Sequence, residues 1–234
     1  MRAIRPIHRT RHSTALIACI TAVILAACTG PGAGVSSPSA SPEPTYLTEE
    51  ILCDAVSNDL LKDQLSLKVR FYHFQHSSDV DQNGLTVNYF ECRLYGDQSS
   101  PQGTFGLLIS YNPYEQLELS HTEFSSLDEK GLDETTFDGV DGRGYVWVGE
   151  GGTLLEAAWL YPDSQALEIT LFHINSNDRI YSEDDLERLR EVLKELITTI
   201  PPVAAGPAQR PLMVPPNPNK KDKQLDNRQG TSTP

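Results

Sequence analysis

The chain has 234 residues and a formal net charge of −13, from 19 Lys and Arg against 32 Asp and Glu. The imbalance is concentrated between residues 45 and 200, which hold 10 basic and 29 acidic side chains. An acidic body argues against nucleic acid as a partner, because nucleic-acid-binding surfaces are basic, and against lying flat on anionic lipid headgroups. We expect the carboxylates to maintain solubility and mutual repulsion; cation binding is the alternative explanation.

Residues 1–27 have the three parts of an export signal. A positive segment without acidic residues precedes an apolar run of 13 residues, from Ala15 to Ala27. That run is shorter than the roughly 20 residues needed to span a membrane. It ends in Leu-Ala-Ala directly before Cys28, which matches a bacterial lipobox. We predict cleavage before Cys28 and a lipid on its sulfur, tethering the protein to the extracytoplasmic face of the cell membrane. Plain secretion and an uncleaved anchor are the alternatives.

Three further segments follow the predicted signal peptide. Residues 28–44 join the lipidated cysteine to a run of Gly, Ser, Pro and Ala, which predicts a flexible linker. Residues 45–200 are long enough to form one globular domain with its own core. Residues 201–234 are rich in proline and carry a net positive charge, and we predict that they are a disordered tail.

Four cysteines are present, and two are accounted for by the signal peptide and the lipid site. The remaining pair, Cys53 and Cys92, is expected to form a disulfide, because exported proteins fold in an oxidising environment. Free thiols or a metal site are the alternatives.

The first half of the domain predicts one helix and three strands. A helix is expected from Thr48, which suits an N-cap and precedes two glutamates, and this helix would carry Cys53. Alternating apolar and polar residues predict strands over 65–74, 85–95 and 104–111. A bond from Cys92 to Cys53 would place the helix against these strands.

The second half repeats this order and ends in a long helix. Asn112-Pro113 predicts a helix that ends near Gly131, and Ser182 predicts the cap of a last helix that Pro201-Pro202 would end. Strands are expected between them over 144–148, 154–161 and 167–174. We therefore predict an α+β domain, an antiparallel sheet of about six strands with three helices packed on it. Its order would be helix, three strands, helix, three strands, helix.

The segment between the first two strands contains Asp79, Asp81 and Asn83, followed by glycine. Oxygen side chains at alternate positions resemble the start of a calcium-binding loop. The bidentate glutamate expected at the twelfth position is replaced by Phe90, and the flanking elements are strands. A polar hairpin turn built on Asn-Gly is the simpler interpretation, and calcium binding is the alternative.

One face of the predicted sheet is rich in aromatic residues and arginines. If the strands alternate regularly, Tyr72, Tyr89 and Tyr95 project from this face together with Arg93. Such residues are typical anchors for a partner. The alternative is that helices cover them and make a second core layer.

No pattern predicts catalysis. His73 and His76 would face opposite sides of a strand, while His121 and His173 fall on apolar faces, where histidines are usually part of the core. Nucleophile elbows, phosphate-binding glycine loops and zinc-protease motifs are not found in the sequence. We expect no catalytic residue and no cofactor, with calcium as the one candidate ligand.

The lipobox, the Ser/Pro linker and the two cysteines of the domain resemble small actinobacterial envelope lipoproteins of unknown function. The run from Gly139 to Tyr145, ahead of strands and a helix, resembles the same group and a PsbP-like sandwich. This resemblance covers residues 48–200 and implies the outer leaflet of the cytoplasmic membrane of a high-GC Gram-positive cell. It implies no catalytic residues.

These observations together predict a non-catalytic, lipid-anchored envelope protein that binds or scaffolds other envelope components. Its partners would be the membrane, through the lipid on Cys28, and envelope proteins or wall polymer. A carrier of a small amphiphilic ligand, held in a cleft between sheet and helices, is the first alternative. An uncharacterised hydrolase is the second.

Overall fold

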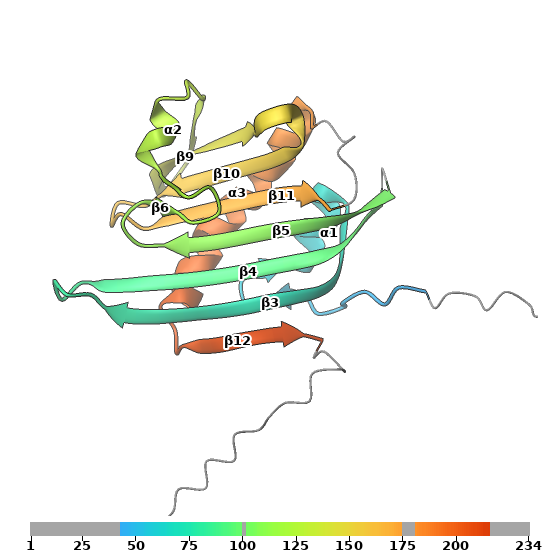
Figure 1. The fold of residues 1–234 in the computed structure, drawn as a ribbon, viewed down its shortest axis with the longest axis horizontal. Coiled ribbons are helices and arrows are strands. Elements are labelled where there is room, and N and C mark those ends of the chain that lie inside the picture. The colour runs from blue at the N-terminus through green and yellow to red at the C-terminus, as the bar shows by residue number, and fades with distance from the viewer. Residues whose placement is uncertain (1–42, 100–101, 175–180, 216–234) are drawn as a thin grey trace, which may run out of the picture. The chain divides into compact units, whose positions relative to one another are not determined.

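A computed structural model of the chain describes residues 43–99, 102–174 and 181–215. The predicted signal peptide, Cys28 and nearly all of the predicted linker lie outside these residues. At the centre is an antiparallel sheet of eight strands in the order β12-β3-β4-β5-β11-β10-β9-β8 (Figure 1). Its strands are β3 (Leu67–Val80), β4 (Thr86–Ser99), β5 (Gln102–Asn112), β8 (Glu134–Phe137), β9 (Val140–Val148), β10 (Leu154–Leu160), β11 (Ala166–His173) and β12 (Gln209–Val214).

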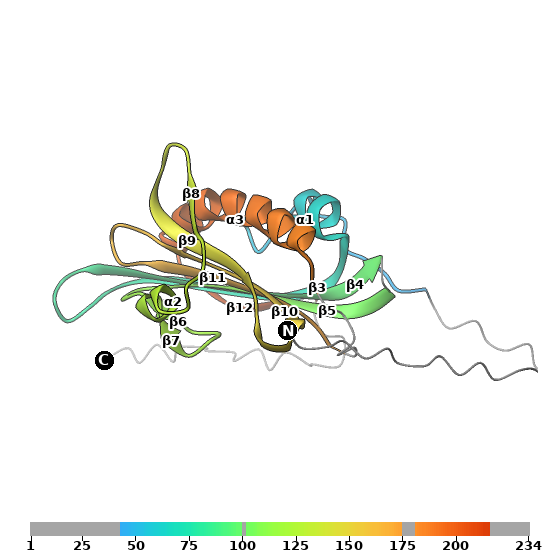
Figure 2. The ribbon, with the colours of Figure 1, turned by 90° about the horizontal axis from the view of Figure 1, so that it is seen from above.

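The two faces of this sheet are covered differently (Figure 2). Helices α1 (Asn58–Leu65) and α3 (Glu183–Ala204) pack on one face and enclose the main hydrophobic core. Against part of the other face lie β6 (Gln116–Leu117), β7 (Thr122–Glu123) and the short helix α2 (Ser125–Asp128). The remaining elements are β1 (Ile51–Leu52), β2 (Val56–Ser57) and the 3-10 turn η1 (Glu150–Gly152).

The α+β class and the number of α-helices are confirmed for the described residues, whereas the predicted six-stranded sheet and its order are wrong. The six expected strands are present, and two additional strands, β8 and β12, extend the sheet at its two edges. None of the helices in the described part of the chain is long and apolar enough to cross a bilayer.

The N-cap of the first predicted helix is Ser57, nine residues later than the expected Thr48, so Cys53 does not lie on a helix. Residues 51–57 form the β1–β2 turn, in which Cys53 has a φ of 51°. The Asn58 side chain donates hydrogen bonds to the carbonyls of Leu47 and Glu49, which holds this segment out of helical geometry. The helix then begins after Ser57, whose hydroxyl accepts a hydrogen bond from the Leu60 amide.

The helix predicted between Asn112 and Gly131 is also wrong. Positive φ angles at Tyr114, Glu115 and His121 break any continuous helix, and four residues of α2 are all that forms. The apolar periodicity is real, because Leu117 and Phe124 are buried, but they are buried in a small cluster against the sheet. Burial of a few apolar residues in a compact loop can imitate a helical stripe.

Helix α3 begins where predicted, with the Ser182 amide donating to the Asp185 carboxylate at 2.9 Å. It does not end at Pro201 and Pro202, which lie inside it. A proline at 201 leaves the carbonyl of Ile197, four residues earlier, without its helical donor. The Tyr161 hydroxyl supplies the missing hydrogen bond at 3.0 Å, so the helix continues to Ala204.

The predicted disordered tail is wrong for its first part, because α3 extends to Ala204 and residues 209–214 form β12. This strand pairs with β3 and so supplies partners for backbone groups of β3 that would otherwise be unpaired. Pro211 lies where the register of the pair shifts, a position where a missing amide is tolerated. Proline-rich composition therefore gave the wrong structure here.

We predict that Tyr161→Phe destabilises the domain by about 1–3 kcal/mol, because it leaves the Ile197 carbonyl without a donor inside the protein. Urea denaturation followed by circular dichroism would measure the free energy of unfolding. Tyr114→Phe is the matched control, since it also removes one hydroxyl hydrogen bond but at an exposed position. Equal effects of the two substitutions would contradict this account of the helix.

Candidate functional site

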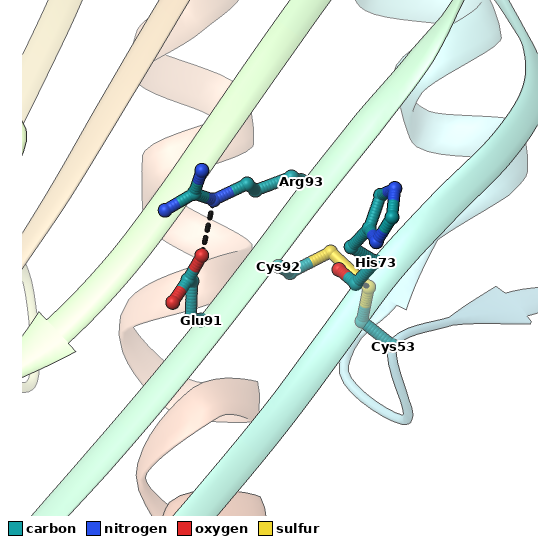
Figure 3. The surroundings of a disulfide bond; sticks show 5 residues. All are labelled: Cys53, His73, Glu91, Cys92 and Arg93. Carbon is teal, nitrogen blue, oxygen red and sulfur yellow. Dashed lines mark hydrogen bonds and ion pairs between the residues drawn. A yellow bond between two sulfur atoms is a disulfide. The ribbon is translucent and has the colours of Figure 1, made fainter. Parts of the chain in front are cut away.

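The predicted disulfide is present between Cys53 and Cys92, with a Cα–Cα distance of 6.0 Å (Figure 3). Both residues are fully buried, and Cys92 projects from the face of β4 that the helices cover. The bond closes a loop with a sequence separation of 39, for which chain-entropy arguments give about 4 kcal/mol of stabilisation. It ties the β1–β2 turn to the middle of the sheet.

The face of β3 and β4 opposite the helices, here called the open face, carries Phe71, His73 and Gln75 on β3. On β4 it carries Tyr89, Glu91, Arg93 and Tyr95. All seven side chains are exposed or half-buried. Three of the four residues predicted for a binding face therefore share this surface.

Tyr72, the fourth predicted residue, lies on the other side and is buried against the core. The cause is a β-bulge: Val69 pairs with Gly96 and Phe71 with Tyr95, so Arg70 is an extra residue. One inserted residue reverses the facing of every later side chain. Gly96 permits this, because a Cβ there would collide with the Lys68 carbonyl oxygen.

Aromatic rings are grouped on the open face. Phe71 and Tyr95 stack with ring centroids 4.9 Å apart, and His73 meets both rings edge-on at 6.2 Å. In the same register row, Phe172 of β11 lies over Gly106 of β5. The result is a row of rings that crosses the strands of the sheet.

Glu91 organises the polar part of the open face. Its carboxylate forms an ion pair with Arg93 (Figure 3) and accepts a hydrogen bond from the Gln75 amide at 2.7 Å. Cys92 lies between Glu91 and Arg93 in sequence, and its side chain points to the opposite side of β4. The strand thus presents a charged pair to solvent and a disulfide to the core.

A groove of about 810 Å³ adjoins this polar part. Its walls come from β3 and β4, from the β6–β7 hairpin and from the start of β12. Its charged residues are Glu91, Glu118, Glu123 and Arg210, and Tyr89 supplies an aromatic wall. Sequence reasoning missed this groove because it placed 112–131 in a helix and 201–234 in a disordered tail.

The β6–β7 wall of the groove is held to the sheet by a buried carboxylate. Glu168 of β11 is 1% exposed and accepts the backbone amides of Leu119 at 2.7 Å and Ser120 at 3.0 Å. Removal from water raises the pKa of Glu168, although these hydrogen bonds oppose the rise. The carboxylate therefore anchors the hairpin at a desolvation cost.

The predicted calcium loop lies at the tip of the β3–β4 hairpin. Asp81 closes the turn by accepting the amides of Asn83 and Leu85, each at 2.8 Å, while Gly84 takes a φ of 80°. The Tyr114 hydroxyl also donates to Asp81 at 2.7 Å, and these hydrogen bonds lower the pKa of Asp81. Calcium binding by Asp79, Asp81 and Asn83 stays a prediction.

The four histidines in the described part of the chain do not form a cluster of metal ligands. His73 is exposed on the open face while His76 is buried on the helix side, as their spacing predicted. His121, expected in a core, is exposed in the β6–β7 turn. Within residues 43–99, 102–174 and 181–215, no group of three or more His, Cys, Asp or Glu is arranged to hold a metal.

Comparison of the chain with protein-family models, with curated protein sequences and with solved structures finds no match.

We predict that Glu168 makes the domain less stable as pH rises. The raised pKa means that the folded state favours the protonated carboxyl of Glu168. The stabilisation of the folded state is therefore complete at any pH below the pKa that glutamate has in the unfolded chain. It is lost as pH climbs through the raised folded value. The free energy of unfolding should therefore fall less between pH 4.5 and 7 in Glu168→Gln than in the unsubstituted chain, measured by urea denaturation.

Glu129→Gln is the control for this measurement, because Glu129 is exposed. It should reproduce the pH profile of the unsubstituted chain. A Glu168→Gln profile parallel to that of the unsubstituted chain would contradict the assignment.

Proposed function

We propose that the protein is a non-catalytic, lipid-anchored cell-envelope protein that binds envelope proteins or wall polymer through its open face. The observation that carries this proposal is the pairing of two of the four cysteines, Cys53 and Cys92. Cys53 and Cys92 are joined in a buried disulfide, which supports an oxidising compartment. Cys28 then remains as the cysteine that directly follows the export signal and lipobox.

The open face supports the binding part of the proposal. Tyr89, Arg93 and Tyr95 are accessible on one surface beside the row of rings, and aromatic residues with arginine are enriched at binding interfaces. The area is only partly covered by the β6–β7 and α2 segment (Figure 2).

The carrier alternative needs a cleft between the sheet and the helices. In the described residues this interface is filled by core side chains such as Leu94, Leu193 and Leu196, each 0% exposed. The large hollow lies elsewhere, in the groove beside the open face. A filled core with exposed aromatic residues favours a binding module over a carrier.

We predict that the protein expressed in an actinobacterial host incorporates a palmitate label, and that Cys28→Ala abolishes both the label and retention in the membrane fraction. Two acyl chains are needed for stable anchoring, so loss of the modification releases the protein. Cys19→Ala is the matched control, since it removes a cysteine of the signal peptide and should leave both unchanged. An unlabelled unsubstituted chain would reject the anchor.

The binding part has a separate test. Crosslinking of the acylated protein in its own membranes, followed by mass spectrometry, should recover specific partners, and the pair Arg93→Ala/Tyr95→Ala should reduce their recovery. Lys62→Ala/Asp63→Ala, at exposed positions on α1, is the control. Equal recovery with the open-face pair and with this control would reject the open face while leaving the anchor standing.

A further inference from the structure

The groove beside the open face has an excess of negative charge. Glu118 and Glu123 line it and are exposed, and neither forms an ion pair within the described residues. Glu91 is already paired with Arg93, and Arg210 is the one lysine or arginine among the lining residues. A ligand that completes this site should therefore bring positive charge.

The acidic character continues into a neighbouring hollow of about 410 Å³ at the β3–β4 tip, which shares Tyr89 with the groove. Asp79 and Asp81 line this hollow, and no lysine or arginine does. Val80, Tyr89 and Tyr114 are 69%, 39% and 48% exposed there, an unusual gathering of accessible apolar surface. Carboxylates and apolar side chains thus alternate along one continuous surface.

The uncharged lining suits a polypeptide better than a compact small molecule. Gln116 is exposed and presents a side-chain amide, which can hydrogen-bond to main-chain peptide groups. Tyr89 and Pro211 provide flat apolar surfaces of the kind against which proline-containing extended segments dock.

The chain itself supplies a segment of this chemistry. Residues 216–234 begin with two prolines among their first three positions and then carry Lys220, Lys221, Lys223 and Arg228 against two aspartates. They follow directly on β12, whose first residues form a wall of the groove. We propose that the groove is the binding site of this basic C-terminal segment of the same chain.

The reach is sufficient. From Pro215 back to Gln209 the strand covers roughly 20 Å, at about 3.3 Å per residue. Lys221 and Lys223 lie six and eight residues after Pro215, distances of about 21 and 28 Å when the chain is extended, and Arg228 can reach about 45 Å. Tethering gives the segment an effective concentration in the millimolar range, so a weak intrinsic affinity is enough to occupy the groove. A partner that uses the groove must then displace the tail.

The test uses the full chain in detergent and a variant that ends at Pro215. A labelled peptide of residues 216–234 should bind the shortened variant saturably, with an affinity that falls as salt rises. It should bind the full chain at least about tenfold more weakly, because the tethered copy competes. Equal affinity of the peptide for the two chains would overturn the proposal. So would a competition experiment in which added anionic wall polymer takes up all of the peptide and the shortened variant retains none.

Charge reversals locate the site. In the shortened variant, Glu118→Lys/Glu123→Lys should weaken peptide binding about tenfold, and a peptide with Lys220→Glu, Lys221→Glu and Lys223→Glu should restore it. Asp63→Lys/Glu195→Lys makes the same charge change on the helix-covered side and should leave affinity unchanged. A loss as large in this control would overturn the groove assignment, because it would show attraction to net charge alone.

Discussion

The extra residue in β3 is the constraint on which both faces of the sheet depend. Up to Val69 the strand alternates in one phase, and after the bulge it alternates in the other. The shift sends Tyr72 and Phe74 into the core and turns Phe71 and His73 outward. Without it, the stacked pair of Phe71 and Tyr95 could not form. The β3 side chains of the open face lie there because one residue of β3 has no partner on β4.

Features with local physical causes could be predicted from the sequence. The disulfide followed from the number and position of cysteines, the start of α3 from Ser182 and Asp185, and the central strands from alternation. Features decided by tertiary contacts were not. The Tyr161 hydroxyl that lets α3 pass two prolines is 36 residues away from the carbonyl it caps, and the bulge depends on the fit between Gly96 and the Lys68 carbonyl.

The candidate site shows the same division. Tyr89, Arg93 and Tyr95 were predicted to share a surface, and they do, because β4 alternates without interruption. The groove could not be predicted, since its walls come from segments whose structure was wrongly predicted. The hairpin that forms one wall is folded by positive φ angles and held by the distant Glu168 carboxylate. Neither feature leaves a pattern in sequence.

Strand β12 has a consequence for how the chain is handled. It covers β3, whose 14 residues make it one of the two longest strands of the sheet. A polypeptide cut before Gln209 would present a bare hydrogen-bonding edge to solvent, and such edges recruit strands from other molecules. Strand β12 thus protects the sheet against self-association. Affinity tags or truncations intended for this terminus should leave residues 209–214 in place.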